Sequence, residues 1–138
     1  MVNVLDKVQP KNKEQLKQLI NYAFKHNIYD LNFIDTSKIT DMSNLFINCE
    51  YDIDVSNWDV SNVTDMAGMF VGCENFNCDL SYWDVSNVTD MDNMFVNCKK
   101  FNCDLSDWDI SNITRWKNMF AGCDKMTIPN WYKLYHRK

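Results

Sequence analysis

The sequence predicts an α/β solenoid, in which about four turns of 25 residues, each a strand plus a short helix, stack behind an N-terminal capping helix. Three observations support this prediction. Trp58, Trp83 and Trp108 recur at intervals of 25 residues. Within each unit the apolar residues first alternate, as in a strand, and are then spaced by three and four, as in a helix. An amphipathic stretch precedes the first unit and would cover the end of the stack, as repeat proteins require.

The repeat is strongest in the middle of the chain. The unit that starts at Trp58 and the unit that starts at Trp83 share 19 of 25 residues. The unit before them is one residue shorter, and the unit from Trp108 loses the pattern after Lys125. We therefore expect a single domain over residues 1–138, with a capping helix at 10–28, the repeats at 29–123, and a C-terminal cap and tail at 124–138.

Each unit is expected to contain a strand, a tight turn and a short helix. Leu80–Val85 ends in the period-two pattern of a strand, and five apolar residues in Val88–Cys98 fall on one face of a helix. The threonines before these helical stretches are candidate N-caps. An Asn or Gly stands before each repeated Cys, where a left-handed C-cap is expected. These positions are Thr64, Thr89 and Thr114, and Asn48, Gly72, Asn97 and Gly122.

The two ends depart from the repeat. Residues 12–27 carry an apolar stripe with a capping-box pair, Asn12 and Gln15, which predicts a helical lid; a partner-binding amphipathic helix is the alternative. Residues 128–135 keep large apolar side chains and are expected to cover the last core layer. The basic residues 136–138 are expected to be a solvated tail.

The repeated motifs also resemble a known family. Met-Phe-x-x-Cys, then an apolar residue, then Trp-Asp-Val-Ser-Asn-Val-Thr-Asp-Met, is similar to the BspA-like leucine-rich repeats of Mycoplasma-type bacterial surface proteins. The resemblance covers about residues 29–123. It implies a short leucine-rich-repeat-like stack. Because members of that family are often secreted or lipid-anchored adhesins, it also implies an adhesin or surface-protein role.

Six cysteines admit three interpretations, namely reduced structural thiols, disulfides or a metal site. Ile53 and Ile128 occupy the slot of Cys78 and Cys103 in neighbouring turns, which favours buried thiols that behave as small hydrophobic groups. Both histidines lie outside the repeats, and no nucleophile-base motif or phosphate-binding loop occurs. We therefore expect no enzyme, no metal and no cofactor.

One column of aspartates is the main candidate site. These residues lie between two inward positions in every turn, so we expect them to point outward. At a strand spacing of about 4.8 Å, their mutual repulsion is about 1 kcal/mol per pair in water. Either each carboxylate accepts hydrogen bonds from the Ser-Asn that follows it, or the column binds a cation or a basic partner. The column comprises Asp35, Asp59, Asp84 and Asp109.

Further candidates differ from turn to turn, as residues that provide specific recognition often do. Asn57, Tyr82 and Asp107 share one outward column beside the aspartates, and Tyr is favoured in interfaces. Arg115 and Trp116 replace the Asp-Met pair of the two preceding turns. We expect them to pack against the C-terminal cap or, alternatively, to anchor a partner.

Charge restricts the classes of partner. The formal net charge is -5, and the lysines concentrate near the two ends, so direct binding of nucleic acid is disfavoured. The sequence shows no signal peptide and no membrane span, so we expect no membrane contact and a cytoplasmic protein, or a surface protein if a leader has been removed. We hypothesise a non-catalytic protein-interaction module whose acidic face binds a protein with a basic surface. The alternatives are a small phage-type inhibitor or effector that blocks a nucleic-acid-handling protein, and an adhesin fragment.

Overall fold

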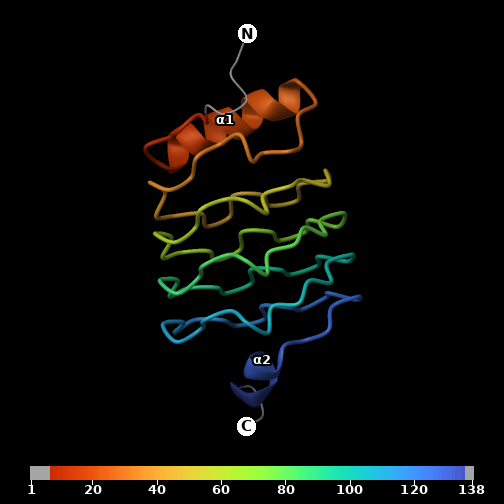
Figure 1. Cartoon of the computed structure of the whole chain (residues 1–138). Coiled ribbons are helices and arrows are strands. Elements are labelled where there is room, and N and C mark those ends of the chain that lie inside the picture. The colour runs from red at the N-terminus through yellow and green to blue at the C-terminus, as the bar shows by residue number, and fades with distance from the viewer. Residues whose placement is uncertain (1–6, 136–138) are drawn as a thin grey trace.

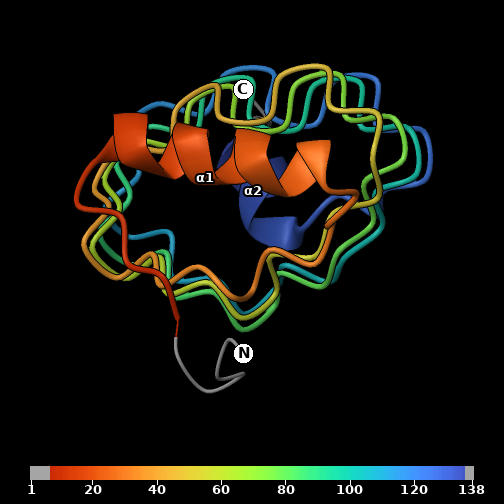
Figure 2. The ribbon, with the colours of Figure 1, turned by 90° about the horizontal axis from the view of Figure 1, so that it is seen from above.

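The computed structural model describes residues 7–135 as a stack of coil layers between two helices (Figure 1). Helix α1 (Lys13–Lys25) lies at the N-terminal end and α2 (Asn130–Tyr135) at the C-terminal end. Viewed down the stack, successive layers follow nearly the same path (Figure 2). The predicted tail at 136–138 lies outside the described residues.

The predicted α/β solenoid is wrong. Among the described residues, the chain between α1 and α2 contains no helix and no sheet. Its only β-type pairing consists of isolated parallel bridges, such as Asp65 with Asp90. The layers are built from turns and coil, so neither the strand nor the short helix predicted for each unit forms.

Positive φ angles explain why the predicted helices are absent. Asn93 and Asn97 both have φ of 61°, whereas a right-handed helix requires a φ near −63°. The residues that would have made one helical face are therefore held in successive tight turns. The two positions are occupied by Asn or Gly in every layer, as Asn44, Asn48, Gly68, Gly72, Asn93, Asn97, Asn118 and Gly122, all with positive φ. The left-handed conformation predicted before each repeated Cys is confirmed, but it closes a turn and not a helix.

The turn geometry accounts for the choice of Asn and Gly. Met94 N–H donates to the Met91 carbonyl at 3.2 Å, and Cys98 N–H donates to the Phe95 carbonyl at 3.1 Å. These bonds place Asn93 and Asn97 third in their four-residue turns, where a type II turn requires positive φ. Asn and Gly are the residues that adopt that conformation most readily.

Alternate N–H groups in the same segment bond to the next layer. Asn93 and Phe95 donate to the carbonyls of Lys117 and Met119 at 2.8 and 2.9 Å. Equivalent bonds recur at the two preceding interfaces, for example from Phe70 to the Met94 carbonyl at 2.9 Å. A helix would need these N–H groups for its own backbone bonds, so the interlayer bonds and the helix exclude each other.

Tight turns also replace the predicted strands. Trp83 N–H donates to the Leu80 carbonyl at 3.1 Å, and Val88 N–H donates to the Val85 carbonyl at 3.0 Å. Leu80, Trp83 and Val85 nevertheless face the core and are buried. The sequence pattern therefore identified the inward residues but not the backbone that carries them.

The core consists of aromatic columns that run through the layers. Phe70 and Phe95 are fully buried, and their rings stack at a centroid distance of 5.6 Å and an interplanar angle of 7°. The repeated tryptophans Trp58, Trp83 and Trp108 each donate the indole N–H to a backbone carbonyl of the preceding layer, as Trp83 does to Val55 at 3.1 Å. Trp131 of α2 makes the same bond to Leu105 at 2.9 Å, so α2 covers the last layer.

Helix α1 covers the first layer. It lies inside the predicted range 10–28, and the Asn12 side chain accepts from Gln15 N–H at 2.9 Å, as an N-cap does. Leu16, Ile20 and Ala23 are buried against the core. Burial of these three side chains closes this end of the stack to solvent.

Candidate interaction face

The predicted aspartate column is held in place by short local bonds. Asp84 Oδ1 accepts from the N–H of Ser86 at 3.1 Å and from its hydroxyl at 2.6 Å. Asp59 and Asp109 make the same pair of bonds to the serine two residues later. Such Asx turns compete with strand pairing for the backbone N–H, which is a further reason why no strand forms here.

A second acidic column lies beside the first and was missed by the sequence analysis. Asp79 Oδ1 accepts from the N–H and hydroxyl of Ser81 at 3.0 and 2.6 Å. Asp54 and Asp104 are bonded in the same way. The signal was present in the sequence, because Asp-x-Ser occurs twice per unit, five residues apart.

The bonding leaves one oxygen of each carboxylate available to a partner. The two serine bonds are made to Oδ1, and among the described residues Oδ2 of Asp59, Asp84 and Asp109 accepts no hydrogen bond. The Ser86 hydroxyl and then its N–H hold the pKa of Asp84 below its usual value, and Ser111 does the same for the pKa of Asp109. The exposed carboxylates of Asp84 and Asp109 are therefore charged and fixed in orientation at neutral pH.

Asp35 differs from the rest of its predicted column. Its Oδ1 accepts from Ser37 N–H at 3.0 Å, and its Oδ2 accepts from the Gln9 side chain at 3.0 Å. Val8 also pairs with the backbone on both sides of Ile34. The N-terminal segment therefore covers Asp35, which leaves the exposed part of the column to Asp59, Asp84 and Asp109.

The predicted variable column is exposed. The Tyr82 side chain is 90% exposed, the largest value among the exposed large hydrophobic residues. Asn57 and Asp107 are exposed at the equivalent positions. We use the name acidic face for both aspartate columns with Tyr82 and Asp107, that is, Asp54, Asp59, Asp79, Tyr82, Asp84, Asp104, Asp107 and Asp109.

Open clefts follow the second aspartate column. One cleft of about 370 Å³ lies between Asp79 and Asp104 and is lined by Cys78 and Cys103. Another, of about 320 Å³, lies between Asp54 and Asp79. The second aspartate column is therefore flanked by shallow clefts between adjacent layers.

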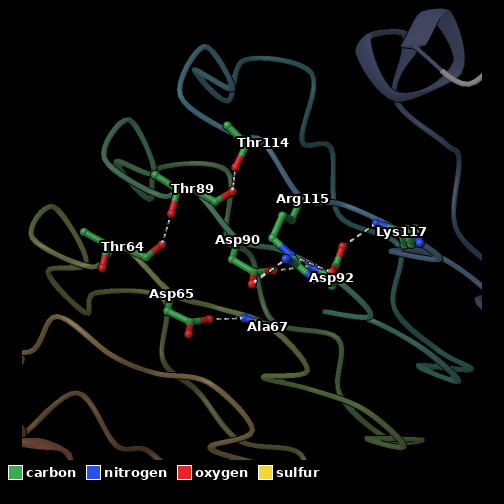
Figure 3. Close-up of polar contacts among 9 residues, drawn as sticks. All are labelled: Thr64, Asp65, Ala67, Thr89, Asp90, Asp92, Thr114, Arg115 and Lys117. Carbon is green, nitrogen blue, oxygen red and sulfur yellow. Dashed lines mark hydrogen bonds and ion pairs between the residues drawn. The ribbon is translucent and has the colours of Figure 1, made fainter.

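Arg115 and Trp116 lie on a different edge from the acidic face. Arg115 Nε is 3.2 Å from Asp92 Oδ2 and 3.6 Å from Asp90 Oδ2, so its charge is paired with the preceding layer (Figure 3). Trp116 stacks on Trp131 of α2 at 6.0 Å and 10°. Trp116 thus packs against the C-terminal cap, while Arg115 neutralises carboxylates.

The threonines predicted as N-caps have another role, because the helices they would cap do not exist. Thr89 donates its N–H at 2.9 Å and its hydroxyl at 3.2 Å to the Thr64 carbonyl of the preceding layer. Thr114 repeats these bonds to Thr89 (Figure 3). This column of threonines therefore links successive layers, and each threonine directly precedes one of the bridged residues Asp65, Asp90 and Arg115.

The six cysteines are free thiols that bond within the stack. Cys98 donates to the Phe70 carbonyl at 3.0 Å, and Cys73 and Cys123 make equivalent bonds at 2.9 and 2.8 Å. Burial raises the pKa of Cys73 and of Cys78 to about 12. Thiols with such pKa values are almost entirely protonated at neutral pH and are weak nucleophiles.

We predict that changing Cys78 and Cys103 together to isoleucine alters the free energy of unfolding by less than about 1.5 kcal/mol. Leu80 N–H donates to Cys103 Sγ at 3.3 Å and needs a new acceptor. Ile53 occupies the position of Cys103 in an earlier layer. There the N–H of Leu31, which is equivalent to Leu80, donates to the Asp54 carbonyl at 2.9 Å. In the variant, the Leu80 N–H can make the equivalent backbone bond. Urea denaturation measures the change. A double variant that fails to fold, or a wild type that melts earlier with a zinc chelator, contradicts this role for the thiols.

We also predict acid destabilisation. Serine hydrogen bonds lower the folded-state pKa of Asp54, Asp79, Asp84, Asp104 and Asp109. A depressed folded pKa adds stability above the unfolded value of about 3.9, and this stability is lost as the pH falls through the folded pKa. The melting temperature should be level from about pH 7 to 5 and should fall below about pH 4. The Ser86→Ala variant should show a shallower fall, and identical profiles for the two proteins contradict the assignment.

The fold and surface together define a class of protein, a coil-layer repeat domain with one acidic face. The chain belongs to the Mycoplasma protein family of unknown function DUF285, whose model matches residues 14–131. No curated protein and no solved structure matches the chain. The finer assignment to BspA-like leucine-rich repeats is not confirmed by this family match.

Two kinds of feature are absent from residues 7–135. No group of three or more His, Cys, Asp or Glu side chains is arranged to hold a metal ion. In the same range, neither helix combines the length and the apolar character that a bilayer crossing requires.

Proposed function

We propose that this DUF285 chain is a non-catalytic protein-interaction module that binds a basic surface of a partner protein through the acidic face. The observation that supports this best is the pair of exposed aspartate columns, in which serine bonds fix Oδ1 and leave Oδ2 available. A fixed array of charges loses little side-chain entropy when a partner binds. It also accelerates encounter with a surface of opposite charge.

Tyr82 supports a docking role for the same face. It stands almost fully exposed between Asp79 and Asp84, each of which is bonded to its own serine. Tyr presents a large contact area with only two side-chain torsions, so a partner can bury it at small entropic cost. We therefore place the centre of the interface at Tyr82.

Comparative affinity capture tests the proposal. The bait is the whole chain, and the test variant is Asp84→Asn with Asp109→Asn, which removes two charges but keeps the side-chain shape. The matched control, Glu50→Gln with Glu74→Gln, removes two charges from exposed residues outside the acidic face. A protein with a basic surface should be retained by wild type and control and lost by the test variant. Equal retention by all three baits would remove the acidic face from the interface.

The finer assignment, a BspA-like surface protein, is a second candidate, supported by the repeated motifs Met-Phe-x-x-Cys and Trp-Asp-Val-Ser-Asn-Val-Thr-Asp-Met. If the protein is displayed on cells, antibodies against the purified chain should label intact cells. Labelling only after permeabilisation contradicts display and leaves the interaction proposal untouched.

A further inference from the structure

The last layer ends in backbone groups that lack the partners their equivalents have. Gly68, Phe70 and Gly72 each donate their N–H to the next layer, at 2.8, 2.9 and 2.8 Å. Within residues 7–135, the matching N–H groups of Asn118, Phe120 and Gly122 donate to no acceptor, and the Thr114 carbonyl accepts no bond. We call residues 114–122 the open edge.

The open edge is accessible along most of its length. Helix α2 covers its inner side, where Phe120 packs edge-on against Tyr132 at 5.1 Å. Lys117, Asn118, Ala121 and Gly122 are nevertheless exposed. Asn118 and Gly122, the two outer donors of the row, therefore lie at exposed positions, whereas Phe120 between them is buried.

Charge at the open edge is opposite to that of the layers above it. At the bridged position, Asp65 and Asp90 of the two preceding layers are replaced by Arg115 in the last layer. Two residues further along the chain, Lys117 of the last layer takes the position of Asp92. Arg115 already lies 3.2 Å from Asp92, which shows how a cation in one layer pairs with an anion in the next (Figure 3). A segment added below Arg115 and Lys117 would be favoured if it carried carboxylates at the same two positions.

We propose that the open edge binds an acidic segment of another polypeptide by backbone addition, with the segment in the tight-turn conformation of a further layer. Three carbonyls of that segment accept from Asn118, Phe120 and Gly122, one N–H of it donates to the Thr114 carbonyl, and two carboxylates face Arg115 and Lys117. Backbone addition to an unpaired edge is a general mode of peptide recognition. A second copy of the chain cannot supply the segment from its own first layer, because α1 packs on that layer with Leu16 and Ile20 buried.

The first test is amide hydrogen exchange measured by NMR on the whole chain. Without ligand, the amides of Asn118 and Gly122 should exchange at least about 100-fold faster than those of Asn93 and Asn97, which are bonded to the next layer. Slow exchange at the open edge that depends on protein concentration would identify a second copy as the occupant and overturn the proposal.

The second test uses a synthetic probe, acetyl-Thr-Asp-Ala-Asp-Gly-Ala-Ala-Val-Gly-amide. It follows the repeat pattern with acids opposite Arg115 and Lys117, glycines at the two left-handed positions, and alanines where larger side chains would meet α2. At saturation it should slow exchange at Asn118 and Gly122 by about tenfold or more. The control peptide carries lysines in place of both acids.

A protein variant completes the test. Lys117→Glu removes a cation that has no ion-pair partner among the described residues, so the fold should persist while probe affinity falls by about threefold or more. Protection by the acidic probe that the lysine peptide and Lys117→Glu both weaken supports the proposal. No protection, or equal protection by both peptides, overturns it. Neither result bears on the acidic face, which lies elsewhere on the layers.

Discussion

Replacing Phe95 with alanine should lower the free energy of unfolding by about 3–5 kcal/mol, measured by urea denaturation. Phe95 is fully buried, and its ring stacks on Phe70 at 5.6 Å, on Phe120 at 5.7 Å and on Phe101 at 4.4 Å. Truncation would leave a cavity between two layers that the interlayer hydrogen bonds hold apart. Because total stabilities of single domains are about 5–15 kcal/mol, this loss would be a large share.

The control for this prediction is Tyr82→Ala, which removes an aromatic side chain that is 90% exposed. It should change the free energy of unfolding by less than about 0.5 kcal/mol. A Phe95→Ala protein within about 1 kcal/mol of wild type would contradict the aromatic column as the centre of the core.

Replacing Gly72 with valine should lower the free energy of unfolding by about 2–3 kcal/mol. Gly72 has φ of +72°, and a Cβ atom there would collide with Asn48 Oδ1 of the preceding layer. Valine would place a β-branched side chain on a left-handed backbone and against the Asn48 side chain. The melting temperature measures the effect.

A swap provides the control for Gly72. Asn48→Gly combined with Gly72→Asn exchanges the residues of two adjacent layers at positions that both have positive φ. It removes the Asn48 side chain from the contact and places a residue tolerant of left-handed backbone at 72. The swap should melt much closer to wild type than Gly72→Val, and equal losses in both would contradict the turn geometry.

The sequence predicted the inward residues of the repeats and the N-terminal helix, because a 25-residue period, buried aromatics and an amphipathic stripe leave strong signals. It failed on the backbone because consecutive tight turns also return apolar residues every three or four positions. The distinguishing signal was Asn or Gly at two sites four apart, such as Asn93 and Asn97, since a helix cannot pass through two positive φ angles. A single Asn or Gly of this kind is equally typical of a helix end, which is why the pattern before each Cys favours a helix.

The candidate site was only partly predictable, for physical reasons that differ between residues. Asp84 and Asp109 could be found because they recur, and Asp79 could have been found from its Asp-x-Ser motif. The covering of Asp35 by Gln9 could not, because that bond joins residues 26 positions apart, outside the repeat. The open edge likewise depends on which layer is last and on where α2 packs.

The association rate with the captured partner, measured across a salt series, tests the central claim that the acidic face is a docking surface. Exposed charges steer encounter and are screened over about 8 Å at physiological ionic strength. Asp84→Asn with Asp109→Asn should slow association and flatten its dependence on salt, while Glu50→Gln with Glu74→Gln should leave both nearly unchanged. In the contrary outcome, the Asp variant keeps the wild-type association rate at every salt concentration and shows only a lower melting temperature. That result would mean that the aspartates stabilise turns and that the acidic face is not a docking surface.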